Sequence, residues 1–168
     1  MPKEKYSRKA ISKKSIESEK KVEQIPDSFL QEATVSDIVN AMRIVESGGE
    51  RKPYETKSKD KGLGAFQYSK KTWEDESKRA FGKVLPMTPR NQELVTFNVV
   101  SGLVKRGLSP KQIASYWNSG RTNWRGNSGV NEYDVPFDTP THVLKVSQEL
   151  LKILKKRKPT LTDHLRSQ

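Results

Sequence analysis

Apolar residues in the middle of the chain recur every three or four positions, which is the spacing of helices with one buried face. Gly residues and Ser/Thr-Pro pairs lie between these stretches, where one helix ends and the next begins. The pattern predicts five helices, at about 34–47, 70–81, 88–106, 109–118 and 139–158. The expected buried stripe of the third is Leu94, Phe97, Val100 and Val104, and that of the last is Val143, Val146, Leu150 and Leu154.

Two loops interrupt this helical pattern. The segment 62–67 contains too many Gly residues for a helix interior, so it predicts a shaped loop or a short hairpin. A second loop, rich in Gly and Asn, covers 119–138. The fold class is therefore predicted to be mainly α, with at most a small β-hairpin.

The composition predicts one domain with two tails. Residues 1–32 are rich in Lys, Ser and Glu, and 156–168 are basic, which leaves 33–155 as the folded domain. Only 32% of the chain is apolar, against about 45–50% in globular domains on a scale that also counts Gly. Part of the chain is thus expected to lie outside the core.

Glu46 is the first candidate for chemistry. It falls in the last turn of the first predicted helix, beside the apolar Val45. The C-terminal end of a helix carries partial negative charge, and apolar packing disfavours an ionised carboxyl. Both effects raise the pKa of a carboxyl group, as a general acid requires. A solvated Glu at a helix end is the alternative.

Two further segments combine glycines, amides and aromatic rings. In 62–68, glycines allow close approach of a ligand, and Gln67 offers a donor and an acceptor for sugar acetamido groups. In 116–120, the rings of Tyr116 and Trp117 can stack on sugars while Asn118 contacts their polar groups. Taken alone, the first segment favours a tight hairpin without a ligand, and the second favours a core Trp followed by an Asn-Gly helix end.

Taken together and in order, the motifs resemble those of the lytic transglycosylase (SLT-type) domain of the lysozyme superfamily. That family has E-S, then G-L-M-Q, then A-Y-N-A-G. The corresponding segments here are Glu46-Ser47, Gly64-Ala65-Phe66-Gln67 and Tyr116-Trp117-Asn118-Ser119-Gly120. Thr72-Trp73 and the helix start at Thr139 also match, and the resemblance runs from about Val35 to Leu154.

This chain departs from the family pattern in both short motifs and at one further position. Ala65-Phe66 replaces the Leu-Met of G-L-M-Q. Trp117, with Tyr116 before it, replaces the Tyr of A-Y-N, which keeps a stacking face but loses a hydroxyl. His142 stands where the family usually has a Tyr near the acid. A structural His at a helix start is the alternative for this last position.

The resemblance implies an α+β lysozyme-like fold whose cleft binds peptidoglycan glycan strands. It implies that Glu46 protonates the oxygen leaving N-acetylmuramic acid and then deprotonates the C6 hydroxyl, so that a 1,6-anhydro sugar forms. It also implies that a set of residues contacts the substrate. His142 is aligned with a position near the acid. The implied contact residues are Ser47, Gly64, Gln67, Tyr116, Trp117 and Asn118. No metal or organic cofactor is implied.

Other functions stay open from the sequence. A hydrolytic lysozyme would use a second carboxylate, for which Asp60, Glu74 and Asp75 are the candidates in the sequence after Glu46. A noncatalytic glycan-binding relative would keep the fold without the reaction. A nucleic-acid-binding protein would use the net charge of +12, but no nucleic-acid motif is present.

Composition narrows the setting. The chain has no Cys, which excludes disulfides, Cys-ligated metals and thiol nucleophiles. The basic excess predicts attraction to anionic cell-envelope polymers. The sequence contains no run of 18 apolar residues and therefore predicts no membrane span. The first 30 residues also lack the apolar core of a signal peptide. The resemblance implies action at the cell wall, which the protein could reach in a phage virion or through a holin pore. A leader that is removed, or a protein that stays inside the cell, is the alternative.

Overall fold

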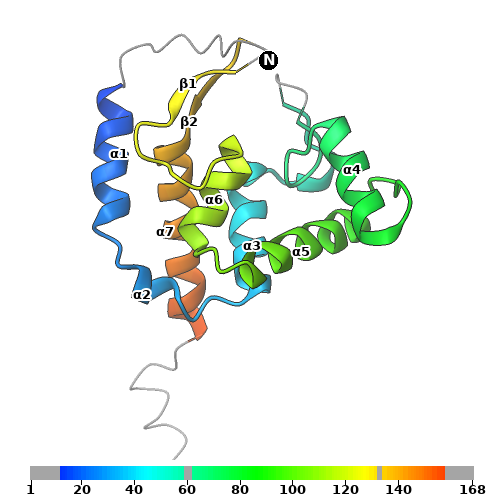
Figure 1. Cartoon of the computed structure of the whole chain (residues 1–168), viewed down its shortest axis with the longest axis horizontal. Helices are drawn as coiled ribbons and strands as arrows, with labels where there is room; N and C mark the ends of the chain where they lie inside the picture. Colours follow the sequence, from blue (N-terminus) through cyan, green and yellow to red (C-terminus); the bar gives the residue numbers. More distant parts are fainter. Residues whose placement is uncertain (1–11, 59–61, 132–133, 158–168) are drawn as a thin grey trace, which may run out of the picture.

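The computed structural model describes residues 12–58, 62–131 and 134–157, and this part of the chain is mainly helical with one small antiparallel sheet (Figure 1). Its elements are α1 Lys13–Glu23, α2 Asp27–Leu30, α3 Val35–Glu46, the 3-10 turn η1 Pro53–Glu55, α4 Lys70–Phe81, α5 Pro89–Lys105, α6 Pro110–Ser119, β1 Ser128–Val130, β2 Pro136–Asp138 and α7 Thr139–Arg157. No described helix combines the length and the apolar character needed to cross a bilayer.

Helix α7 is the centre of the packing. It contacts α1, α3 and α6 (Figure 1). Its predicted apolar stripe is confirmed, because the four residues of that stripe are all buried. They are Val143, Val146, Leu150 and Leu154. The helix is predicted to continue to the residue before Pro159, and its described part ends at Arg157.

The predicted helix starts are confirmed by their caps. The side chains of Thr34, Ser69, Thr88 and Ser109 each accept a hydrogen bond from the backbone N–H three residues later. Such caps satisfy N–H groups that have no partner inside the helix. These starts are predictable because each depends on residues only a few positions apart.

The buried face of α5 differs from the prediction. Leu94, Phe97 and Val104 are 40–46% exposed, and only Val100 of the expected stripe is buried. The helix instead buries a face that includes two polar residues, Gln92 and Thr96. Both bond to the loop 62–68, whose buried polar groups need partners. This requirement determines which side of a largely apolar helix faces inward.

The N-terminal segment also differs from the prediction. The composition predicts a tail over 1–32, of which 1–11 lie outside the described residues. In the described part, α1 and α2 pack on the domain and bury Val22 and Leu30 completely or almost completely. The hydroxyls of Ser18 and Thr141 lie 2.8 Å apart between α1 and α7. These contacts join distant parts of the chain, so no local pattern indicates them. Helix α1 is also short and mostly polar, and it therefore shows no apolar periodicity that would predict a buried face.

The small sheet lies in the second predicted loop. Strands β1 and β2 pair antiparallel, with Gly129 opposite Phe137. The segment 62–68 forms a tight turn, in which Leu63 makes isolated antiparallel β-bridges to Lys57 and to Tyr68. A small hairpin is thus present, but it lies in the segment predicted as a loop, and the segment 62–67, where a hairpin was the alternative, forms the shaped loop.

Candidate functional site

The end of α3 and the start of α7 bring Glu46 and His142 together. Nε2 of His142 lies 3.3 Å from Oε1 of Glu46, and their side chains are only 10% and 14% exposed. The two atoms do not have hydrogen-bond geometry, and Nε2 is buried without another hydrogen-bond partner among the described residues. Catalytic contacts of this kind often become shorter and better aligned only when substrate is bound.

Burial keeps the imidazole neutral. Burial, together with the positive charge of Lys145, lowers the pKa of His142 to about 4. A neutral imidazole has one N–H donor and one nitrogen acceptor. Depending on the tautomer, Nε2 can therefore donate to an ionised Glu46 or accept a hydrogen bond from a protonated one.

Ser47 stabilises the end of α3. Its buried hydroxyl donates to the carbonyl of Arg43 at 2.7 Å. Arg43 in turn donates to Oε1 of Glu93 on α5 at 2.7 Å, and the Tyr54 hydroxyl donates to the same oxygen at 2.6 Å. The turn that carries Glu46 is thus anchored to α5, and the contact that the structure gives to Ser47 is with the backbone.

Gly64 is required by the shape of the loop. Its φ is +75°, and a Cβ atom there would lie 2.2 Å from Oε1 of Gln92. That oxygen accepts the N–H of Ala65 at 2.9 Å. Gly64 is buried and lies outside the pocket described below, so the structure gives it a role in the loop itself.

Gln67 folds back on the same loop. Its backbone has a φ of +55°, and its side-chain Nε2 donates to the carbonyl of Gly64 at 2.9 Å. The residue is half-buried and lines the pocket, but in this arrangement its amide N–H₂ is used within the loop. A ligand that bonded to the amide nitrogen would have to share it or turn the side chain.

The loop and α6 are joined through Trp117. The indole Nε1 donates to the carbonyl of Phe66 at 3.2 Å, and the ring meets Tyr68 edge to face at 5.2 Å. One residue further, Oδ1 of Asn118 accepts from the hydroxyl of Thr139 at 2.7 Å. Thr139 lies one helical turn before His142, so α6 connects the loop to the Glu46–His142 pair.

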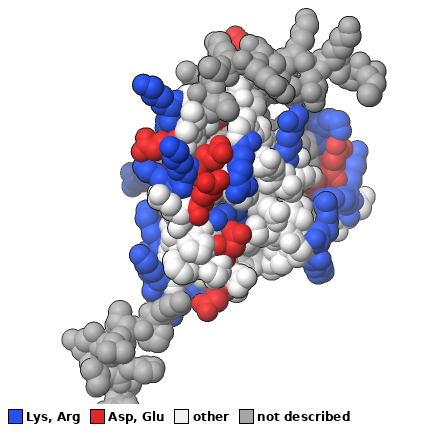
Figure 2. All heavy atoms as spheres, turned by 60° about the vertical axis from the view of Figure 1, so that its left-hand side comes forward, with Lys and Arg blue, Asp and Glu red and all other residues white. Residues whose placement is uncertain are grey.

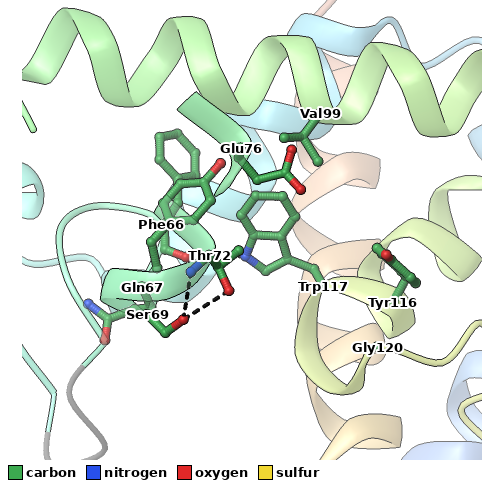
Figure 3. Close-up of a pocket in the computed structure, with 10 residues that line it drawn as sticks. Phe66, Gln67, Ser69, Thr72, Glu76, Val99, Tyr116, Trp117 and Gly120 are labelled. Atoms are coloured by element: carbon green, nitrogen blue, oxygen red, sulfur yellow. Dashed lines mark hydrogen bonds between the residues drawn. The ribbon is translucent and has the colours of Figure 1, made fainter. Parts of the chain in front are cut away.

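A pocket of about 340 Å³ lies between the loop, α4, α5 and α6 (Figure 3). Of the predicted substrate-binding residues, Gln67, Tyr116 and Trp117 line it. Glu46 and His142 do not, and neither do Ser47, Gly64 and Asn118. The candidate site thus has two separate parts, an acid pair and an aromatic pocket, which are linked through the hydrogen bond between Asn118 and Thr139.

The pocket contains a carboxylate that the sequence analysis missed, that of Glu76. Of the three acids considered there, Glu74 does not line the pocket, Asp75 is ion-paired with Lys71 on the surface, and Asp60 lies outside the described residues. A signal was present in the sequence. Glu76 lies four residues after Thr72, so the two side chains are on the same face of α4, and Thr72 is in the first turn after the loop.

No group of three or more His, Asp or Glu side chains within the described ranges could hold a metal ion. In comparisons with known proteins, no family model matches the chain, and no curated protein or solved structure matches it. The chemistry of the site is therefore argued from its own residues and from the motif resemblance.

Proposed function

We propose that this protein is a lytic transglycosylase that cleaves the bond between N-acetylmuramic acid and N-acetylglucosamine in peptidoglycan. The observation that carries the proposal is the enclosed Glu46–His142 pair, which α6 connects to an aromatic pocket. Cleavage of a glycosidic bond needs a proton donor and a pocket that binds the sugar, and α6 links these two parts here.

In the proposed reaction, Glu46 acts first as an acid and then as a base. Its proton goes to the glycosidic oxygen, the bond from C1 of N-acetylmuramic acid breaks, and the substrate's own acetamido group stabilises the positive centre. The carboxylate then removes the proton of the C6 hydroxyl, and O6 bonds to C1. No water is consumed, and Glu46 regains its proton. One carboxyl group is therefore sufficient.

His142 is proposed as a positioning residue for this cycle. A neutral imidazole 3.3 Å from the carboxyl can contact Glu46 in both protonation states without adding a charge. The family's usual Tyr would offer a hydroxyl in the same place. Since either group can hydrogen-bond to the acid, we expect His142→Tyr to keep more activity than His142→Ala.

The test is mass spectrometry of fragments released from purified peptidoglycan by the wild type, Glu46→Gln and Glu50→Gln. Gln keeps the shape of Glu but cannot transfer a proton, and Glu50 is an exposed control just after the helix. We expect 1,6-anhydro ends from the wild type and the control, and a loss of at least about 100-fold with Glu46→Gln, the usual scale of general acid–base catalysis.

Other products would change the assignment. Reducing ends would show that water attacks, as in a hydrolytic lysozyme. Glu76 would then be the leading candidate for the second carboxylate, because it lines the pocket. If folded wild type released no fragments while a control enzyme did, and still sedimented with peptidoglycan, it would be a noncatalytic binding protein.

A further inference from the structure

We infer that the pocket beside Trp117 binds a primary ammonium group, with Glu76 as its counter-ion. The inference rests on the proposed function, where the group would belong to the wall polymer. Two parts of that polymer can present it: an amino sugar that lacks its acetyl group, or the side chain of a diamino acid in the wall peptide. Both present the same chemistry to the pocket.

The charge of the pocket is opposite to that of the protein. The whole chain carries a net charge of +12. The ten residues that line the pocket include no Lys or Arg, and Glu76 is the charged residue among them. A single carboxylate in a pocket of a basic protein favours a cationic ligand over an anionic one.

The indole of Trp117 lies beside this carboxylate. Figure 3 shows the Glu76 carboxylate next to that indole, while Tyr116 lines the same pocket farther away. The hydrogen bond from Trp117 to the carbonyl of Phe66 fixes the position of the indole. Aromatic faces attract cations. An aromatic ring next to a carboxylate thus forms a site for an ammonium group.

Tyr68 adds no competing charge. Burial, followed by the nearby charge of Glu76, raises the pKa of its phenol, although a hydrogen bond with Thr96 opposes this. The hydroxyls of Tyr68 and Thr96 lie 2.8 Å apart, so the phenol is neutral and already paired. Glu76 is then the group that sets the charge preference of this pocket wall.

The ion pair of Glu76 with Arg79 leaves room for a ligand. The Arg79 side chain is 66% exposed, whereas that of Glu76 is 20% exposed. Such surface pairs contribute little to stability, and an ionised carboxylate has about four acceptor positions. A ligand ammonium can therefore bind from the pocket side while Arg79 stays on the solvent side or moves away.

The test measures calorimetric binding of matched probes to the Glu46→Gln protein, which keeps the probes intact. One pair is the tetramer of glucosamine and the tetramer of N-acetylglucosamine. The other is a wall-type tripeptide with its lysine amine free or acetylated. We expect the free amine to bind about tenfold more tightly in at least one pair, as for a charge-assisted contact of about 1.4 kcal/mol. The pair that shows the preference identifies the source of the ammonium group.

Three variants in the same background locate the effect. Glu76→Gln should abolish the preference for the free amine, while Glu74→Gln, on the same helix but outside the pocket, should keep it. Arg79→Ala should keep or increase it, because it frees the carboxylate. Thermal unfolding checks that each variant is folded.

Equal binding of free and acetylated probes in both pairs would overturn the inference. So would a preference that survives Glu76→Gln. These results are independent of cleavage: a protein that releases anhydro fragments without an amine preference refutes the inference alone. One that shows the preference but releases no fragments refutes the proposed reaction and leaves the ammonium site in place.

Discussion

Two independent structural constraints act on Gly64, which lies in the loop beside the pocket but does not line it. Its φ of +75° is unfavourable for residues with a side chain, and Gln92 occupies the space that a Cβ atom would take. The glycine of the family motif is thus explained here by the packing of the loop on α5.

We therefore expect Gly64→Ala to destabilise the fold by about 2–4 kcal/mol, from backbone strain plus disturbed buried hydrogen bonds of Gln92. Gly82→Ala is the matched control, because its φ is +74° but nothing lies within 4 Å of the added Cβ. It should cost only about 1 kcal/mol. Urea unfolding of both variants measures the difference, and equal losses would contradict the role of Gln92.

The buried imidazole of His142 leads to a separate prediction, which concerns how the free energy of unfolding depends on pH. Its pKa is about 4 in the folded protein against 6.5 ordinarily, so the unfolded chain binds its proton first as the pH falls. As the pH falls from 6.5 to 4, burial of the neutral imidazole should therefore lower the free energy of unfolding by about 3 kcal/mol in total. Above pH 6.5 it should have no such effect. The free energy of unfolding should fall more steeply in this window for the wild type than for His142→Gln. Parallel curves would show that the imidazole titrates normally.

At the scale of elements, the main finding is that α1 belongs to the folded unit. Val22 is completely buried, whereas Ile16 on the same helix is 44% exposed. Lys111 of α6, itself buried, donates to the carbonyl of Ile25 and pairs with Asp27 at 3.0 Å. The connection between α1 and α2 is thus tied to the domain as well.

Substitutions within α1 can test this packing. Val22→Ala removes two buried carbons and should cost about 2 kcal/mol in free energy of unfolding, whereas Ile16→Ala should change it by less than about 0.5 kcal/mol. Chemical denaturation of the two variants compares them directly. If α1 were a loosely attached tail, both substitutions would leave the stability unchanged.

The contrast between α1 and α4 shows what a sequence can predict. The bounds of α4 follow from Ser69 at its start and Gly82 at its end, which are local signals. The docking of α1 depends on partners more than a hundred positions away, such as Thr141 for Ser18. The approach of His142 to Glu46 was expected only because the motif resemblance aligned His142 with a residue near the acid. Glu76 was missed because no motif marks it.

At the scale of the whole molecule, the positive charge is dispersed. Figure 2 shows Lys and Arg side chains mixed with Asp and Glu on the face that includes α1. Arg125 pairs with Glu23 there, and Lys21 pairs with Glu17. Such a surface attracts an anionic polymer without fixing its register. This is the attraction that an enzyme moving along the cell wall would need, while the aligned patch of a nucleic-acid reader is not seen on this face.

The packing of α1 against α7 also imposes an order in time. Ser18 and Thr141, which meet between these helices, are 123 positions apart in the chain. During synthesis α1 leaves the ribosome long before α7 exists, so the contacts between these two helices can form only after α7 has emerged. Contacts this distant in sequence form slowly, because a long loop must close first. Although α1 is made early, we therefore expect it to be among the last of the described helices to dock.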